Sequence, residues 1–154
     1  MGLRLSAAKT LITSIDEGLD FLGWRIQRHR KPGTSQRYVY TYPAKKAVKA
    51  VMAKVKTISR RNNNEPLAVL LPQLNPVLHG WAAYFRFGVS SATFQYLSKY
   101  AWERVVRWIR RRRYCDGRWW PAEVNTALFD PGKMRTIRYR YRGTKIPTPW
   151  TATT

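Results

Sequence analysis

Residues 44–61 read AKKAVKAVMAKVKTISRR and give the clearest secondary-structure signal in this chain of 154 residues. At about 100° per residue, the apolar positions fall within one arc of about 140°, and lysines fill the opposite side. These apolar positions are Ala44, Ala47, Val48, Val51, Met52, Val55 and Ile58. The pattern predicts an amphipathic helix with one buried side and one cationic side, which Asn62-Asn63-Asn64 ends.

The next apolar stretch, after Glu65-Pro66, predicts a short helix that Pro72 interrupts. We expect Asn75 to cap a further helix, with Pro76 at its first position, where a missing N–H costs nothing. Its predicted core-facing residues are Leu74, Val77, Leu78, Trp81, Ala82 and Phe85. Gly80 and Ala83 make its other side small, which predicts close approach of a second helix or of a nucleic-acid backbone. Helix packing is the more common reason.

A third helix is predicted over residues 93–113, capped by Ser90 or Ser91. Its expected buried side consists of Phe94, Leu97, Ala101, Trp102, Val105, Trp108 and Ile109. Arginines crowd its last turns beyond what the helix dipole requires. With Trp102 and Trp108 among them, this end resembles a surface that binds nucleic acid by charge and base stacking.

Strands are predicted on both sides of these helices. Residues 3–13 and 19–27 are expected to flank a turn at Asp16-Glu17-Gly18, and a second hairpin is expected to join 24–28 to 38–42. Residues 135–142, RTIRYRYR, alternate between apolar and arginine positions and predict a strand. The expected fold class is mainly α (α+β): a three-helix bundle with an N-terminal β-hairpin and a basic, partly extended C-terminal tail.

The net charge of +21 favours a polyanionic partner, because phosphates neutralised by lysine or arginine release condensed counterions. Residues 25–61 contain no acidic residue at all. One cysteine and two histidines, His29 and His79, offer no metal-ligand spacing, so neither a metal site nor a cofactor is expected. No apolar run is long enough to span a membrane, and we expect a cytoplasmic protein without a membrane partner.

Basic side chains are therefore the candidate nucleic-acid-binding residues. A solvated cationic surface is the alternative for each. For residues 44–61 the absence of acidic partners at helical spacing favours phosphate contact, whereas for the strand at 135–142 the two interpretations have equal weight. The candidates are Lys45, Lys46, Lys49, Lys56, Arg60, Arg61, Arg86, Arg107, Arg110, Arg111, Arg112, Arg113, Arg138, Arg140 and Arg142.

Residues 75–86, NPVLHGWAAYFR, resemble the signature of the maturase-specific domain, also called domain X or thumb, of group II intron reverse transcriptases. Upstream, residues 2–13 and 19–24 (LDFLGW) are similar to the last conserved blocks of that family's polymerase palm. Residues 138–150, RYRYRGTKIPTPW, are similar to the C-terminal ends of some bacterial members. The residues that match family motifs are Phe21, Leu22, Gly23, Trp24, Asn75, Pro76, Gly80, Trp81 and Tyr84.

The resemblance implies a palm remnant at 1–43, a thumb-like helical domain at 44–113 and a basic, aromatic-rich extension at 114–154. It implies binding of structured intron RNA, with help in folding and splicing, while Trp81, Tyr84, Trp102 and Trp108 are candidates for stacking on bases. The family's Tyr-x-Asp-Asp turn is absent from the sequence, so no catalytic residue is assigned.

Three alternatives stay open beside this reading. One is the C-terminal part of a split or truncated RNA-directed DNA polymerase, clasping an RNA–DNA duplex and partnered by a separately encoded catalytic half. Another is a DNA-binding module that would read bases with Thr93, Gln95 and Lys99. The last is a remnant of a decayed mobile element.

Overall fold

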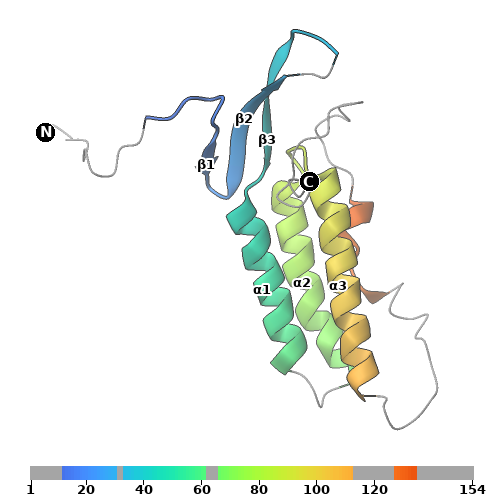
Figure 1. The fold of residues 1–154 in the computed structure, drawn as a ribbon. Coiled ribbons are helices and arrows are strands. Elements are labelled where there is room, and N and C mark those ends of the chain that lie inside the picture. The colour runs from blue at the N-terminus through green and yellow to red at the C-terminus, as the bar shows by residue number, and fades with distance from the viewer. Residues whose placement is uncertain (1–11, 31–32, 62–65, 113–126, 135–154) are drawn as a thin grey trace, which may run out of the picture.

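A computed structural model describes residues 12–30, 33–61, 66–112 and 127–134. A three-stranded antiparallel sheet of β1 (Leu19–Phe21), β2 (Trp24–Arg30) and β3 (Arg37–Pro43) leads into the helices α1 (Lys45–Arg61), α2 (Leu67–Phe85) and α3 (Ser91–Arg112). A short 3₁₀ helix, η2 (Pro131–Lys133), packs against α3 and α2. Figure 1 shows the sheet at one end of the bundle, with α1 and α3 running away from it and α2 running back. The predicted fold class is confirmed.

The sheet differs from the prediction in one respect, because residues 19–27 are two strands and not one. Phe21 pairs with Trp24, and the loop between them consists of Leu22 and Gly23 alone. Both loop residues have positive φ, 48° and 82°, as a type I′ hairpin turn requires. The FLGW stretch is therefore a tight hairpin turn.

Two hydrogen bonds fix that turn against the helices. The backbone N–H of Ala44 donates to the Gly23 carbonyl at 2.8 Å, and the Tyr84 hydroxyl of α2 donates to the Leu22 carbonyl at 3.0 Å. Gly88, after α2, passes so close to the sheet that an added Cβ would lie 2.2 Å from the Trp24 ring. The sheet and the bundle consequently share one packed boundary.

The other strand predictions have mixed outcomes. The turn at residues 15–17 is present, and Gly18 N donates to Ser14 O at 3.1 Å. The hairpin from β2 to β3 is confirmed, with Tyr38, Tyr40 and Tyr42 at alternate positions of β3. Of the predicted strand at 3–13, only residues 12 and 13 are described, and they lie outside the sheet. The predicted strand at 135–142 falls outside the described residues.

The prediction of two helices separated at Pro72 is wrong, because α2 runs unbroken through Pro72 and Pro76. A proline inside a helix removes one backbone hydrogen bond. Here both rings lie four residues apart on the exposed side of α2, where water can solvate the carbonyls left without a donor. Buried leucines on the opposite side, among them Leu70, Leu74 and Leu78, hold the helix to the bundle. Apolar packing therefore outweighs the local cost of the prolines.

Asn75 consequently lies in the middle of α2 and caps nothing. Its side-chain Nδ2 donates to the carbonyl of Ala127 at 2.8 Å, and its Oδ1 accepts from the N–H of Phe129 at 2.9 Å. Leu128 and Phe129 pack on the edge of the core beside it. The amide of Asn75 thus fastens residues 127–129, some fifty positions later in the chain, to α2.

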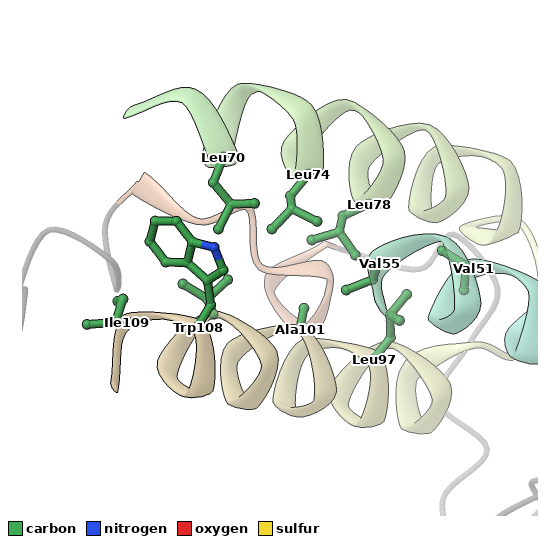
Figure 2. Close-up of a cluster of buried hydrophobic side chains, with 10 residues drawn as sticks. Val51, Val55, Leu70, Leu74, Leu78, Leu97, Ala101, Trp108 and Ile109 are labelled. Atoms are coloured by element: carbon green, nitrogen blue, oxygen red, sulfur yellow. The ribbon is translucent and has the colours of Figure 1, made fainter. Parts of the chain in front are cut away.

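The core lies among all three helices. Figure 2 shows Leu70, Leu74 and Leu78 of α2 facing Leu97, Ala101 and Trp108 of α3, with Val51 and Val55 of α1 beside them. The predicted apolar side of α1 is buried or half-buried, which confirms that helix. Ser90 is buried, and its hydroxyl donates to Phe85 O at 2.7 Å, so its side chain closes the end of α2.

Candidate nucleic-acid interface

Helices α1 and α3 lie side by side in parallel, and their side chains fix the alignment. The Tyr100 hydroxyl donates to Met52 O at 3.3 Å, and Arg104 Nη2 lies 3.4 Å from Lys56 O. Both contacts join residues 48 positions apart in the chain. A constant offset of this kind is expected only of helices that run in the same direction, as Figure 1 also shows.

Arg104 is the main residue of this seam, and it was not among the predicted binding residues. Its Nη2 and Nε donate to the buried Ser59 hydroxyl at 2.9 and 3.2 Å. The hydroxyl of Ser59 in turn donates to Lys56 O at 3.0 Å. Arg104 therefore joins α3 to the C-terminal part of α1 through the Ser59 hydroxyl and the Lys56 carbonyl. The helical spacing of the sequence could not identify this role, because its partners are on another helix.

Cations line the outer edge of the seam. Lys45, Lys49, Lys56 and Arg60 fall within an arc of about 60° at about 100° per residue, adjacent to the side of α1 that carries Met52 and Ser59. From α3, Arg107 and Arg111 come next to it. We call these six exposed residues the α1–α3 basic face: Lys45, Lys49, Lys56, Arg60, Arg107 and Arg111.

The pKa of Arg104 shows how closely these charges gather. Burial of its guanidinium lowers that pKa first, the nearby Tyr100 opposes the shift, and the positive charges of Arg60, Arg107 and Arg111 lower it further. Three cations from two helices therefore act on one guanidinium. The like charges at this end of the bundle repel one another, and an anion placed there would relieve the repulsion.

Acidic residues pair with two arginines of the sheet and leave most cations of the helices without a carboxylate partner in the described chain. Arg28 Nε donates to Asp16 Oδ1 at 2.7 Å, and this hydrogen bond lowers the pKa of the Asp16 carboxyl group. Arg25 Nη1 forms an ion pair with Asp20 Oδ1 at 3.1 Å. On α1 and α3 the sequence offers one acid, Glu103, which pairs with Arg107 at 3.2 Å. The other five members of the basic face have no carboxylate within 4 Å among the described residues.

The remaining predicted cations lie elsewhere. Lys46 and Arg61 are exposed on the side of α1 away from α3, and Arg110 is exposed on α3. Arg86 is half-buried after α2, its guanidinium 5.8 Å from the centre of the Phe87 ring. For Arg112 only the backbone is described. Arg113, Arg138, Arg140 and Arg142 lie outside the described residues, so nothing here bears on their predicted contacts.

The start of α1 has an unusual charge distribution. Lys45 and Lys46 open the helix, no acidic residue occupies its first turn, and the preceding Ala44 is buried. A helix N-terminus carries partial positive charge, so cations there are unfavourable to the helix. Both side chains are exposed and have no carboxylate within 4 Å in the described chain. These lysines do not serve the stability of α1.

The aromatic candidates separate into core and surface. Trp108 is 4% exposed and packs against Leu70 in the core, so the prediction that it stacks on bases is wrong (Figure 2). Trp102 was predicted to be buried but is 38% exposed. Trp81 is half-buried against Phe85 and Phe94, which supports its core assignment.

Two further predictions change with the structure. Thr93 is 2% exposed and is unable to reach a base edge, which weakens the DNA-reading alternative. An added Cβ on Gly80 would meet no atom of the described chain within 4 Å, so the expected helix crossing at Gly80 is wrong there. Tyr84 holds the Leu22 turn, as described above, which gives that motif residue a structural role.

Within the described ranges, no helix has both the length and the apolar character needed to cross a membrane. Those same ranges contain no grouping of three or more His, Cys, Asp or Glu side chains suited to a metal ion.

Comparison with known proteins identifies the helical part of the chain. Residues 48–123 match the family model "Group II intron, maturase-specific domain". The matched region includes most of α1 and the whole of α2 and α3, and thus the helical core and every residue of the basic face except Lys45. No curated protein matches the chain. The chain therefore carries a group II intron maturase-specific domain at residues 48–123.

Proposed function

We propose that this chain binds structured group II intron RNA through the α1–α3 basic face and assists its folding and splicing. The observation that carries the proposal is the alignment of six exposed cations along one seam, held in place by Arg104. The family match supports it, because the maturase-specific domain is a part of group II intron proteins.

The geometry suits phosphate binding. Lys45 and Arg60 are fifteen residues apart on one helix, which spans about 22 Å at about 1.5 Å per residue. Double-stranded RNA is recognised chiefly through its shape, its phosphates and its 2′-hydroxyls, because its deep major groove is closed to side chains. A rigid row of cations matches such a target, and it reduces phosphate repulsion when RNA helices pack together. The protein needs no chemical step for this role.

Two variants with equal loss of charge test the proposal. Lys56→Gln/Arg60→Gln removes two members of the basic face, and Lys54→Gln/Arg61→Gln removes one lysine and one arginine from the other side of α1. Affinity for intron RNA is measured by fluorescence anisotropy across a salt series. The first variant should reduce the log–log salt slope by about 1.4–1.8 units, for two lost phosphate contacts. The second should leave it near the wild-type value.

Unfolding temperatures of both variants provide the control for structure. Equal effects of the two variants on the salt slope would refute a localised interface. A fall in stability for the first variant alone would show that the basic face is structural. Duplex DNA and an RNA–DNA hybrid serve as competitors at matched salt. Stronger competition by the hybrid than by intron RNA would favour the alternative of a polymerase thumb that clasps a primer–template.

A further inference from the structure

A groove with a volume of about 460 Å³ lies between α3 and residues 128–133. This volume is within the range of about 300–1,000 Å³ that is typical of small-ligand sites. The groove is separate from the α1–α3 basic face, because no residue of that face lines it. The RNA binding proposed above does not involve the two lysines and the tryptophan that line this groove.

One wall of the groove is a single stripe of α3. Gln95, Ser98, Lys99 and Trp102 follow the spacing i, i+3, i+4 and i+7, which places them on one side of a helix. Gln95 and Lys99 are exposed, and Trp102 is 38% exposed although nearby Ala101 and Val105 are fully buried. A large aromatic ring is therefore presented between an amide and an ammonium group.

The facing wall is held firmly. Asp130 accepts from Gly132 N at 2.8 Å and from the hydroxyl of Ser98, which joins this wall to α3. The Asn75 amide fixes the backbone at 127 and 129 immediately before it. Lys133 is exposed at the end of η2 and also lines the groove. The site is thus preformed, which reduces the entropy that a ligand loses on binding.

The chemistry of the lining selects the occupant. A tryptophan face stacks on a nucleobase, and single-stranded nucleic acids bind proteins chiefly by such stacking together with cations along the backbone. Lys99 and Lys133 supply two cations at the groove. The Asp130 carboxylate has no cation within 4 Å among the described residues, and it would repel a phosphate but accept an N–H from a base. This arrangement favours a base inside the groove and phosphates at its lysine-bearing edge.

We infer that the groove between α3 and residues 128–133 binds an unpaired nucleotide of the RNA, with its base stacked on Trp102 and its phosphates near Lys99 and Lys133. The inference rests on the proposed RNA binding and adds a preference for single-stranded segments. The basic face then holds the paired regions of the RNA, and the groove holds a base from a loop or a bulge.

The experiment compares two RNAs at one salt concentration: an unstructured twelve-nucleotide strand and a fully paired duplex. Trp102→Ala should weaken binding of the single strand by roughly five- to 150-fold, the effect of one lost stacking contact, and leave duplex binding unchanged. Trp102→Tyr should recover most of the affinity. Phe87→Ala removes an exposed aromatic side chain outside the groove and should change neither affinity.

A second variant, Lys99→Gln/Lys133→Gln, should reduce the salt slope for the single strand by about 1.4 units, with the slope for the duplex unchanged. If Trp102→Ala or the lysine pair weakens both RNAs equally, or neither, the groove inference is overturned while RNA binding itself stands. Competition by an acidic peptide, with loss of that competition in Trp102→Ala, would overturn it in favour of a protein partner. A wild-type chain that binds neither RNA would overturn the proposed function instead.

Discussion

Replacing Asn75 with aspartate separates two roles that the sequence alone does not distinguish. As a helix cap, asparagine and aspartate are nearly equivalent, so the free energy of unfolding would hardly change. In the structure, however, Nδ2 donates to Ala127 O at 2.8 Å while Oδ1 accepts from Phe129 N at 2.9 Å. Asn75→Asp keeps the acceptor, loses the donor and places a carboxylate oxygen against a carbonyl oxygen.

The cost follows from these contacts. One lost hydrogen bond is worth about 0.5–1.5 kcal/mol, and the repulsion between the two oxygens increases it, so we expect a loss of about 1–3 kcal/mol for Asn75→Asp. Asn75→Ala loses both bonds and should cost about the same amount. For a chain of this size, the unfolding temperature should fall by about 2–4 °C for each kcal/mol.

Urea titration followed by circular dichroism measures both variants at pH 7. The defect of Asn75→Asp should shrink in acid, because a protonated carboxyl group can again donate to Ala127 O. The repulsion raises the folded-state pKa of the introduced group, so the variant gains stability relative to wild type as the pH falls through that value. If Asn75→Asp were as stable as wild type at neutral pH while Asn75→Ala was destabilised, the role of Asn75 in holding residues 127–129 would be refuted. A helix-capping role would then explain both results.

Two other predictions follow from exposed and buried groups. Gly80→Ala should raise the free energy of unfolding by about 1 kcal/mol in urea titration, because Gly80 lies in the middle of α2 with open space beside it in the described chain; a loss of stability would indicate a close neighbour. Burial, and then the charge of Arg25, lowers the pKa of His29 below its usual 6.5, so the folded state favours the neutral ring. Stability should therefore be unaffected by His29 above pH of about 6.5 and fall as the pH drops below it, and His29→Gln should flatten that fall in thermal melts from pH 7 to pH 5.

The sequence predicted the helices best where one physical signal dominated. In α1 the apolar period and the lysine side agree, and the structure buries Val48, Val51 and Val55 as expected. In α2 two signals conflict, since Pro72 lowers local helix propensity while the leucine spacing continues through it. The prediction followed the proline and divided the helix in two. Local propensity does not include the free energy that α2 gains by packing against α1 and α3.

The candidate interface was predicted in part for a similar reason. Helical spacing identified Lys49 and Lys56 as exposed, but not that their side of α1 adjoins α3. That alignment depends on Arg104 and Ser59, which are 45 residues apart and carry no local signal. On α3, the prediction that Trp102 is buried was wrong for a similar reason. Trp102 lies at the edge of the apolar arc, and it lines a groove only because residues 128–133 pack opposite it.

The two lysines that open α1 have a consequence for attempts to engineer this domain. A redesign guided only by thermal tolerance would replace Lys45 and Lys46 with glutamates, since each reversal of charge at a helix start gains about 0.3–1 kcal/mol or more. If the proposed function is right, this more stable variant would bind intron RNA more weakly. Screens for heat resistance and screens for splicing activity should therefore select opposite residues at position 45, because Lys45 belongs to the basic face and Lys46 does not.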